Sequence, residues 1–258
     1  MAAFILNFLL ATLQTFVALL PRLALAWIAA FAVLALGIAV LKSRTRTHAS
    51  RVDDGVRAWA KGLRYRDRLD NTTERIGLSW FFRFWTNFAS APSLSFFSLA
   101  IPLFALYQAK GIPGEGISSD SFSIESFLRV PGIWLLPGLC YAGSMLLSFW
   151  LKRVFKRVRP PREEKAFGYK LKDASFPSGH SLTSFCFWMM NAAVALHLSA
   201  PLAIVLALGG ATIVALTGLS RVYLGVHFPT DVLGGFGIGL VWCVCCWIAL
   251  YPAFAPKG

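Results

Sequence analysis

Long apolar stretches dominate this chain of 258 residues and restrict what it can fold into. Hydrophobic residues make up 57% of the chain and charged residues 14%, whereas soluble globular domains contain about 45–50% and about 25%. A helix that crosses a bilayer needs about 20 mostly apolar residues, and the chain has room for six of them. The sequence therefore predicts an all-α, polytopic membrane helix bundle with about six transmembrane helices. It argues against a soluble enzyme and rules out a disordered chain.

The apolar segments differ in how well they fit a membrane span. Residues 4–20 carry polar side chains and are parted from the next segment by Pro21 and Arg22, so we expect an interfacial or partly inserted helix there. Residues 76–91 are aromatic but contain Arg83, which favours a membrane-surface element. The six predicted spans are residues 23–41, 92–109, 132–151, 181–199, 201–219 and 232–254.

Positive charge is concentrated in two stretches, although the formal net charge of the whole chain is +13. Residues 42–83 hold eleven Lys and Arg against five Asp and Glu, and the second basic stretch covers residues 152–172. Cations beside a membrane act as topology signals, contacts to anionic lipids or binding groups for an anionic substrate. We divide the chain into residues 1–75, an N-terminal membrane helix with a basic interfacial connection, and residues 76–258, the main membrane domain.

The five cysteines all lie inside apolar runs, and none has zinc-ligand spacing with a histidine. Free cysteine is among the most buried residue types, so we interpret them as small buried hydrophobic residues. We expect no metal and no cofactor.

The end of the third span carries the first group of candidate functional residues, in the sequence KRVFKRVRPP. Lys152, Lys156 and Arg159 share one helical face if the helix continues that far. Pro160 should end the helix at Arg159. Taken alone, these cations also fit a second interpretation, in which they anchor a helix end at the membrane surface.

The sequence FPSGH immediately before the fourth span supplies the second group. Ser178 and Gly179 at a helix start leave backbone N–H groups free to bind an anion. His180 can gain or lose a proton near neutral pH. The alternative is an ordinary helix cap beside an interfacial histidine.

The third group joins the fifth and sixth spans, where Ser220 and Arg221 precede His227 and Asp231. Asp231 lies four positions after His227, so the carboxylate can hold one imidazole nitrogen and leave the other as a nucleophile. The planar guanidinium of Arg221 suits phosphate oxygens. An interfacial ion pair is the alternative interpretation.

Membrane topology brings the three groups together. The end of span three, the start of four, the end of five and the start of six all lie on one side of the bilayer. Polar groups that converge there are functional by default.

Together and in this order, the three sequences resemble the tripartite motif of the type 2 phosphatidic acid phosphatase superfamily. Lys-x6-Arg-Pro, Pro-Ser-Gly-His and Ser-Arg-x5-His-x3-Asp specify eleven positions, and every one is filled here. The resemblance covers roughly residues 92–250, and residues 1–75 carry none of the motif positions.

The resemblance implies a metal-independent phosphatase that works through a phosphohistidine. His227 would be the nucleophile, Asp231 would orient its ring, and His180 would protonate the leaving oxygen and then activate water. The groups implied to hold the phosphoryl oxygens are Lys152, Arg159, Ser178, the Gly179 backbone and Arg221.

The expected substrate is a membrane lipid phosphate, a monoester or a diphosphate. Undecaprenyl diphosphate, phosphatidate, phosphatidylglycerol phosphate and lipid A all fit, with undecaprenyl diphosphate as the first choice. The aromatic residues of 76–91 could line an access route for the lipid tails. A lipid phosphotransferase, a haloperoxidase and a non-enzymatic channel or transporter are the alternatives. We expect the bilayer as a partner, no nucleic acid, and leave the oligomeric state open.

The predicted location is the cell inner (plasma) membrane, but the side on which the motifs lie is contested. The basic connection 42–83 should lie on the same side as the motifs, which by the positive-inside rule would be the cytoplasm. The resemblance implies the periplasmic or outer side, and we favour that side.

Overall fold

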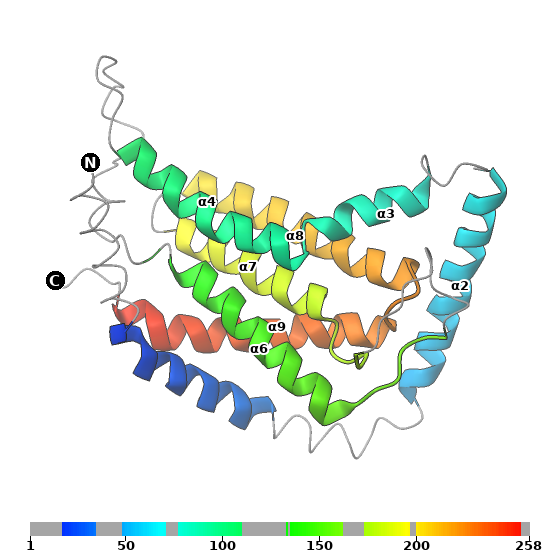
Figure 1. Ribbon diagram of the computed structural model, residues 1–258, viewed down its shortest axis with the longest axis horizontal. Helices are drawn as coiled ribbons and strands as arrows, with labels where there is room; N and C mark the ends of the chain where they lie inside the picture. Colours follow the sequence, from blue (N-terminus) through cyan, green and yellow to red (C-terminus); the bar gives the residue numbers. More distant parts are fainter. Residues whose placement is uncertain are drawn as a thin grey trace.

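The chain folds as a bundle of helices in the computed structural model (Figure 1). No strand occurs in the part of the chain that the structure describes, and the predicted all-α class is therefore confirmed. The described residues are 17–34, 48–70, 77–109, 133, 135–161, 173–196 and 200–253. The helices are Val17–Leu34, α2 (His48–Asp70), α3 (Leu78–Asn87), α4 (Ala91–Ala109), α6 (Leu135–Phe155), α7 (Gly179–Ala195), α8 (Ala200–Tyr223), α9 (Pro229–Leu250) and the 3-10 turn η3 (Tyr251–Ala253).

Helix α7 is the centre of the bundle, since it packs against α6, α8 and α9. Helix Val17–Leu34 joins the same core, where the ring centroids of Trp27 and Trp242 lie 5.0 Å apart. Close approach of α6 to α9 requires a glycine at position 143, because a Cβ there would lie 2.2 Å from the Trp242 ring. Backbones approach closely through such small residues in membrane helix bundles.

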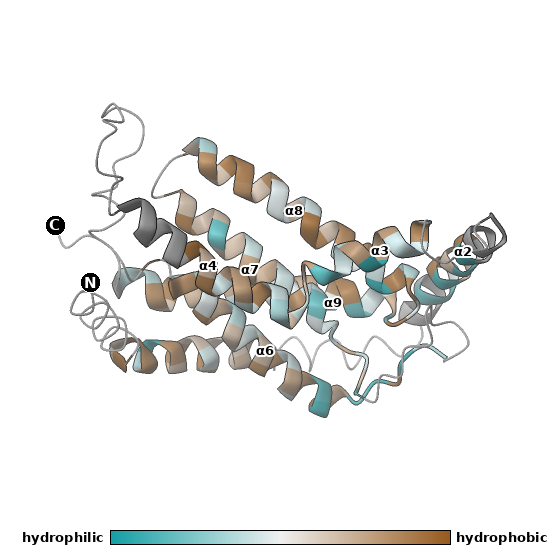
Figure 2. Cartoon of the chain, turned by 45° about the horizontal axis from the view of Figure 1, so that its top comes forward, coloured by the Kyte–Doolittle hydropathy of each residue, from teal (hydrophilic) through white to brown (hydrophobic). Residues whose placement is uncertain are grey.

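Four of the described helices are long and apolar enough to cross a membrane: Val17–Leu34, Leu135–Phe155, Ala200–Tyr223 and Pro229–Leu250. The last three lie within or close to the predicted spans 132–151, 201–219 and 232–254. The predicted span 92–109 is helical as α4, and α7 covers the predicted span 181–199 as far as Ala195, with residues 197–199 outside the described residues. In Figure 2 the bundle helices are largely hydrophobic along their length, whereas hydrophilic colour gathers on α2 and at the nearby end of α6. A polytopic membrane bundle is confirmed, and the count of six spans stays a prediction.

The predicted break at Pro21 and Arg22 is wrong. Both residues lie inside helix Val17–Leu34. Proline lacks an N–H and disturbs the carbonyl four residues earlier, so Pro21 affects Val17, at the start of the described helix. Residues 4–16 of the expected interfacial segment lie outside the described residues.

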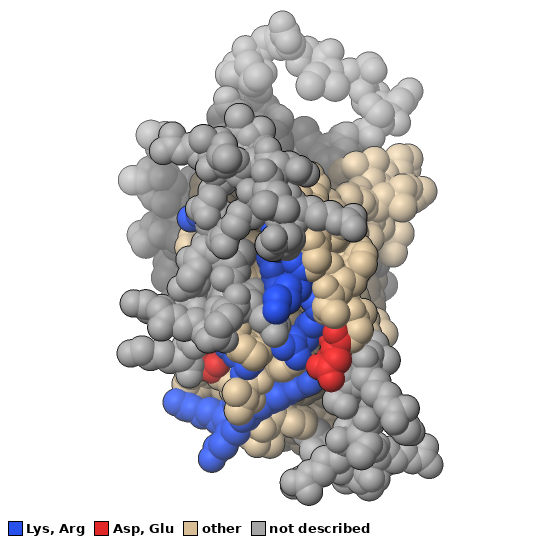
Figure 3. All heavy atoms as spheres, turned by 90° about the vertical axis from the view of Figure 1, so that its right-hand side faces the viewer, with Lys and Arg blue, Asp and Glu red and all other residues tan. Residues whose placement is uncertain are grey.

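The basic connection is more regular than expected, because 23 of its residues form the single helix α2. Helix α2 packs against α8 and α9 at the end of the bundle where α6 and α8 end and α7 and α9 begin (Figure 1). The prediction that this connection lies on the same side as the motifs is confirmed. On this end face, Lys and Arg side chains gather near the centre with acidic side chains beside them (Figure 3).

Candidate active site

The three motif sequences meet at this end of the bundle. The Ser178 backbone N–H, just before α7, donates to the Asp231 carbonyl in the first turn of α9 over 3.0 Å. The His227 backbone N–H donates to the Arg221 carbonyl at the end of α8 over 3.3 Å. Gly225, with φ 70°, makes the turn between α8 and this histidine possible, because only glycine adopts that conformation without strain. Backbone hydrogen bonds therefore fix the second motif sequence against the third and shape the third internally.

Helix α6 ends earlier than predicted. It stops at Phe155, so Lys152, Lys156 and Arg159 do not share one helical face. Lys156 has φ 47° in the left-handed region, which turns the chain out of the helix. Its side chain is exposed, whereas Arg159 is directed inward by the extended segment that follows.

Arg159 reaches the side chain of His227. Its Nη1 lies 3.1 Å from His227 Nε2 and also donates to the Val226 carbonyl over 2.8 Å. A guanidinium can only donate, so Nε2 must present its lone pair and the ring proton must sit on Nδ1. That nitrogen faces Asp231, with 3.5 Å between Nδ1 and Oδ2. The imidazole is thus held in one tautomer, with a nucleophilic nitrogen turned toward the basic groups.

His227 is neutral over the physiological pH range. Burial lowers its pKa to about 4, the positive charges of Arg159 and Arg221 act in the same direction, and Asp231 opposes them. Only 2% of the residue is exposed. A neutral ring is the form that can act as a nucleophile.

Asp231 is completely buried and receives hydrogen bonds on both carboxylate oxygens. Oδ1 accepts from Arg157 Nη1 over 2.7 Å. Oδ2 accepts from the Ser175 hydroxyl and from the Phe228 backbone N–H. The carboxylate sits in the first turn of α9, which begins at Pro229, before the predicted start of the sixth span at residue 232. These bonds hold the charged carboxylate in place beside His227.

Lys152 and Arg159 bind a carboxylate of the chain itself. The Lys152 ammonium donates to one oxygen of Asp173, and Arg159 Nη2 donates to the other over 2.8 Å. Burial raises the pKa of Asp173, but the hydrogen bond and charge of Lys152, followed by those of Arg159, lower it to about 2. Two motif cations therefore converge on a single anionic group, and the side chain of that group is half exposed.

The Pro-Ser-Gly-His segment begins α7 as predicted. Ser178 is the N-cap, and its side chain accepts hydrogen bonds from the backbone N–H and hydroxyl of Ser181. Gly179 lies against α6, where a Cβ would be 3.2 Å from the Ser148 hydroxyl and 4.0 Å from the Lys152 ammonium. Burial holds the pKa of His180 well below its ordinary value, and the charges of Arg221, Lys152 and Arg159 act in the same direction. The Ser178 hydroxyl has a structural partner, so its predicted contact with phosphate stays a prediction.

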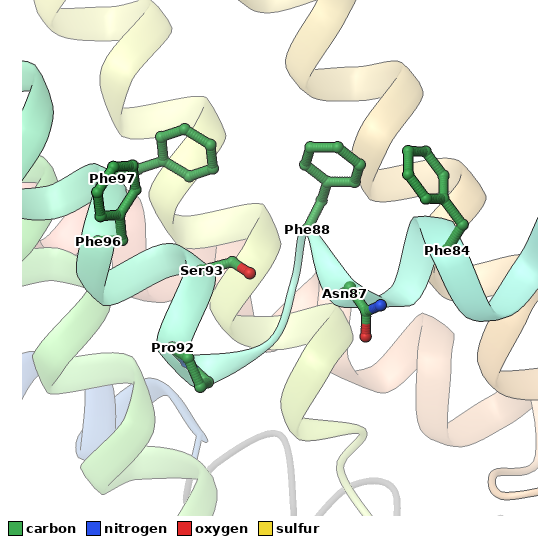
Figure 4. Close-up of a pocket in the computed structure, with 7 residues that line it drawn as sticks. All are labelled: Phe84, Asn87, Phe88, Pro92, Ser93, Phe96 and Phe97. Atoms are coloured by element: carbon green, nitrogen blue, oxygen red, sulfur yellow. The ribbon is translucent and has the colours of Figure 1, made fainter.

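Arg221 is buried at the end of α8 and connects the site to α3. Its Nη1 donates to the Thr86 hydroxyl over 3.1 Å. Thr86 belongs to the predicted aromatic surface element, which forms helix α3, separate from α4. Beside it, at the junction of the two helices, lies a groove of about 400 Å³ (Figure 4). Its lining residues are Phe84, Asn87, Phe88, Pro92, Ser93, Phe96 and Phe97.

The structure adds residues that the sequence analysis did not single out. Arg157 and Ser175 bind Asp231, Asp173 binds two motif cations, and Asp53 of α2 binds Arg157. No local pattern marks them, since each contact joins residues far apart in the chain. From the sequence alone, only the polar character of these four residues is evident.

Three cysteines also come together, away from the motif residues. The Sγ atoms of Cys140, Cys186 and Cys243 lie within 4.8 Å of one another in the packed interfaces of α6, α7 and α9. Cys140 and Cys186 are buried, as expected, and Cys243 is partly buried.

The segment that carries the motif residues is similar to a known protein family. Residues 133–254 match the PAP2 superfamily. This segment is a PAP2 superfamily domain. It contains all eleven positions of the tripartite motif, and the suspected resemblance is confirmed.

Two bacterial relatives are similar to part of the chain. Phosphatidylglycerophosphatase B of Bacillus subtilis is 41% identical over 123 residues, which are 45% of this chain and 57% of the relative. A putative undecaprenyl-diphosphatase of Escherichia coli is 32% identical over 108 residues, covering 41% of this chain and 51% of the relative. The chain thus spans about half the length of these relatives.

A solved structure shares the fold. It is a transmembrane PAP2-type phosphatidylglycerolphosphate phosphatase from Bacillus subtilis, with a TM-score of 0.60 and 23% sequence identity. The similarity covers 88% of this chain and 98% of that structure. The PAP2 membrane fold of this chain therefore extends well beyond the residues that match in sequence.

Proposed function

We propose that this PAP2 protein is a membrane lipid phosphatase that hydrolyses a lipid phosphomonoester or diphosphate through a phosphohistidine. One observation carries the proposal: Arg159 fixes the lone pair on His227 Nε2, while the opposite ring nitrogen faces Asp231. A neutral, oriented imidazole beside a group of cations is suited to attack phosphorus. The phosphatase names of the relatives add support.

In the proposed reaction, Nε2 of His227 attacks phosphorus and the bond from phosphorus to the lipid oxygen breaks. The negative charge of the bound phosphate would favour the protonated form of His180, which donates its proton to that oxygen, and the lipid leaves. Asp231 stabilises the positive charge that develops on the His227 ring. His180, now neutral, takes a proton from water as the water attacks the phosphohistidine, which releases inorganic phosphate and restores His227.

The phosphoryl oxygens would be held by Lys152, Arg159, Arg221, Ser178 and the backbone of Gly179. Fixed cations and N–H donors stabilise the charge of a phosphoryl-transfer transition state without further covalent chemistry. The binding of the two Asp173 carboxylate oxygens by Lys152 and Arg159 supports this assignment.

A lipid suits the site better than a soluble phosphate ester. The aromatic groove at the α3–α4 junction is apolar enough for a hydrocarbon chain, and Thr86 connects its wall to Arg221. Phosphatidylglycerol phosphate and undecaprenyl diphosphate are the substrates that the names of the two relatives suggest. We propose both as candidates, since an apolar groove suits an acyl chain and a prenyl chain alike.

The proposal is tested with purified protein in mixed micelles. We expect phosphate release from phosphatidylglycerol phosphate or undecaprenyl diphosphate to continue in excess EDTA. The reason is that basic side chains, in place of a metal ion, stabilise the charge of the transition state. The assay compares initial rates with EDTA, with Mg²⁺ and with neither. Activity that disappears with EDTA and returns with Mg²⁺ contradicts the metal-independent mechanism.

We propose the inner membrane as the location, with the site on the periplasmic side. A cysteine introduced as Gly168→Cys, with the five native cysteines replaced, lies in the connection between the first two motif sequences. We expect it to react with a membrane-impermeant maleimide in intact spheroplasts. Reaction only after permeabilisation would place the site in the cytoplasm and remove periplasmic undecaprenyl diphosphate as a candidate.

A further inference from the structure

We infer that Asp53 of helix α2 is a positioning residue for this reaction and holds Asp231 in place through Arg157 and the start of α9. The inference rests on the proposed function. It assigns a role to a helix outside residues 133–254, the segment that matches the PAP2 superfamily.

Asp53 is a buried charge on an otherwise polar surface helix. Only 1% of the residue is exposed, whereas the side chain of its neighbour Asp54 is 68% exposed and pairs with Arg57 on the same helix. A buried carboxylate is costly unless it is paired and hydrogen-bonded. Asp53 therefore has to be matched by partners outside its own helix.

Those partners belong to the catalytic end of the bundle. Oδ2 of Asp53 accepts from Arg157 Nη2 over 2.6 Å and from the Thr230 hydroxyl over 2.9 Å. Oδ1 accepts from the Thr230 backbone N–H over 3.0 Å. The donors come from the segment after α6 and from the first turn of α9, so one carboxylate joins three parts of the chain.

The contact with Thr230 supplies a helix cap that α9 cannot make for itself. Its N-cap residue is Phe228, which has no side-chain acceptor, and Pro229 has no N–H. The N–H of Thr230 is the first that needs an acceptor, and the carboxylate of Asp53 provides it from another helix. An anion at a helix N-terminus is also favoured by the helix dipole.

Arg157 transmits this contact to Asp231. Its Nη2 binds Asp53 while its Nη1 binds Asp231 over 2.7 Å. Asp53 thus fixes both the backbone that carries Asp231 and the cation that binds its carboxylate. The 3.5 Å between Asp231 Oδ2 and His227 Nδ1 is already longer than a usual N–H···O hydrogen bond, so the exact position of Asp231 decides whether this bond forms.

The test compares Asp53→Asn and Asp53→Ala with Asp54→Ala, which removes a carboxylate one residue away on the exposed side of α2. We expect both Asp53 variants to lower kcat by about 10–100-fold. That range is typical when a residue that orients a metal-binding side chain by a hydrogen bond is replaced, and Asp53 orients Asp231 in a comparable way. KM should change little, because Asp53 does not touch the phosphate. Asp54→Ala should match the wild type.

A double-mutant cycle separates positioning from a general loss of stability. Because Asp53 acts on Asp231 through Arg157 as well as through Thr230, Asp53→Asn should lower kcat less in an Arg157→Ala background than in the wild type. Effects of the two substitutions that simply multiply, or an Asp53→Asn variant with wild-type kcat, would overturn the inference. Asp53→Asn keeps the side-chain volume and serves if Asp53→Ala does not fold.

A second measurement tests the positioning role of Asp53 without relying on the proposed enzymatic activity. If the wild type releases no phosphate from either lipid, the proposed function fails. The positioning role is then judged from the ring signals of isotopically labelled His227 in detergent. Asp53→Asn should shift them and Asp54→Ala should not, whereas unchanged signals in both variants would count against the role of Asp53.

Discussion

Replacement of His227 by alanine should abolish lipid phosphate hydrolysis, because His227 is the group proposed to form the covalent intermediate. Removal of a catalytic nucleophile has cost on the order of 10⁶-fold in kcat in a well-studied hydrolase, and we expect a loss of similar size. The measurement is phosphate release from phosphatidylglycerol phosphate and undecaprenyl diphosphate in mixed micelles. A second measurement is the acid-labile label that the wild type, but not His227→Ala, retains after rapid quenching with labelled substrate.

Two other histidines are the matched comparisons for this prediction. His48→Ala changes a histidine outside the three motif sequences and should leave the rate unchanged. His180→Ala should lower the rate most for substrates with poor leaving groups, since only departure of the lipid needs an acid. If His227→Ala keeps a wild-type rate on any lipid phosphate, the nucleophile is another residue.

Removal of Arg159 should have the next largest effect. This side chain donates to His227 Nε2 and, together with Lys152, binds the anionic group in the site. Loss of a single donor of this kind typically costs about 10²–10³-fold in kcat, and we expect Arg159→Ala to fall in that range. Arg159→Lys should lose less activity, because lysine keeps the positive charge although it lacks the planar set of N–H donors of a guanidinium.

Arg159→Ala should also change the pH dependence of the reaction in a defined direction. The positive charge of Arg159 helps to lower the pKa of His227 to about 4, so the pKa should rise when the charge is removed. The neutral ring is the active form, and a higher pKa means that the variant loses its nucleophile at a higher pH than the wild type. The acid limb of kcat/KM, checked by NMR titration of the His227 ring, should therefore move to higher pH.

Arg153→Ala provides the control for charge alone. Arg153 lies at the end of the same helix, and its guanidinium stacks on Phe149 with 3.7 Å to the ring centroid. Its removal should leave both the rate and the acid limb unchanged. An acid limb that does not move in Arg159→Ala, or that moves equally in Arg153→Ala, would contradict the proposed contact with His227.

The sequence by itself determined the membrane bundle and the identity of the motif residues. Apolar length and the fixed spacings of Lys152, Arg159, His227 and Asp231 are local properties, and they can be read from neighbouring residues. The sequence also predicts that the motifs lie at one end of the bundle. Two connections lie on the same side of the membrane when an even number of spans separates them, and this holds for the connections that carry the motifs.

Only the tertiary structure decided where the helices end and which groups hold the motif side chains. Lys156 leaves α6 in a left-handed conformation, which hydrophobic periodicity does not encode. Asp53 lies 104 residues from Arg157 in the chain and 177 from Thr230. Contacts over such separations depend on how whole helices pack, so no local spacing could assign a buried carboxylate on α2 to the start of α9.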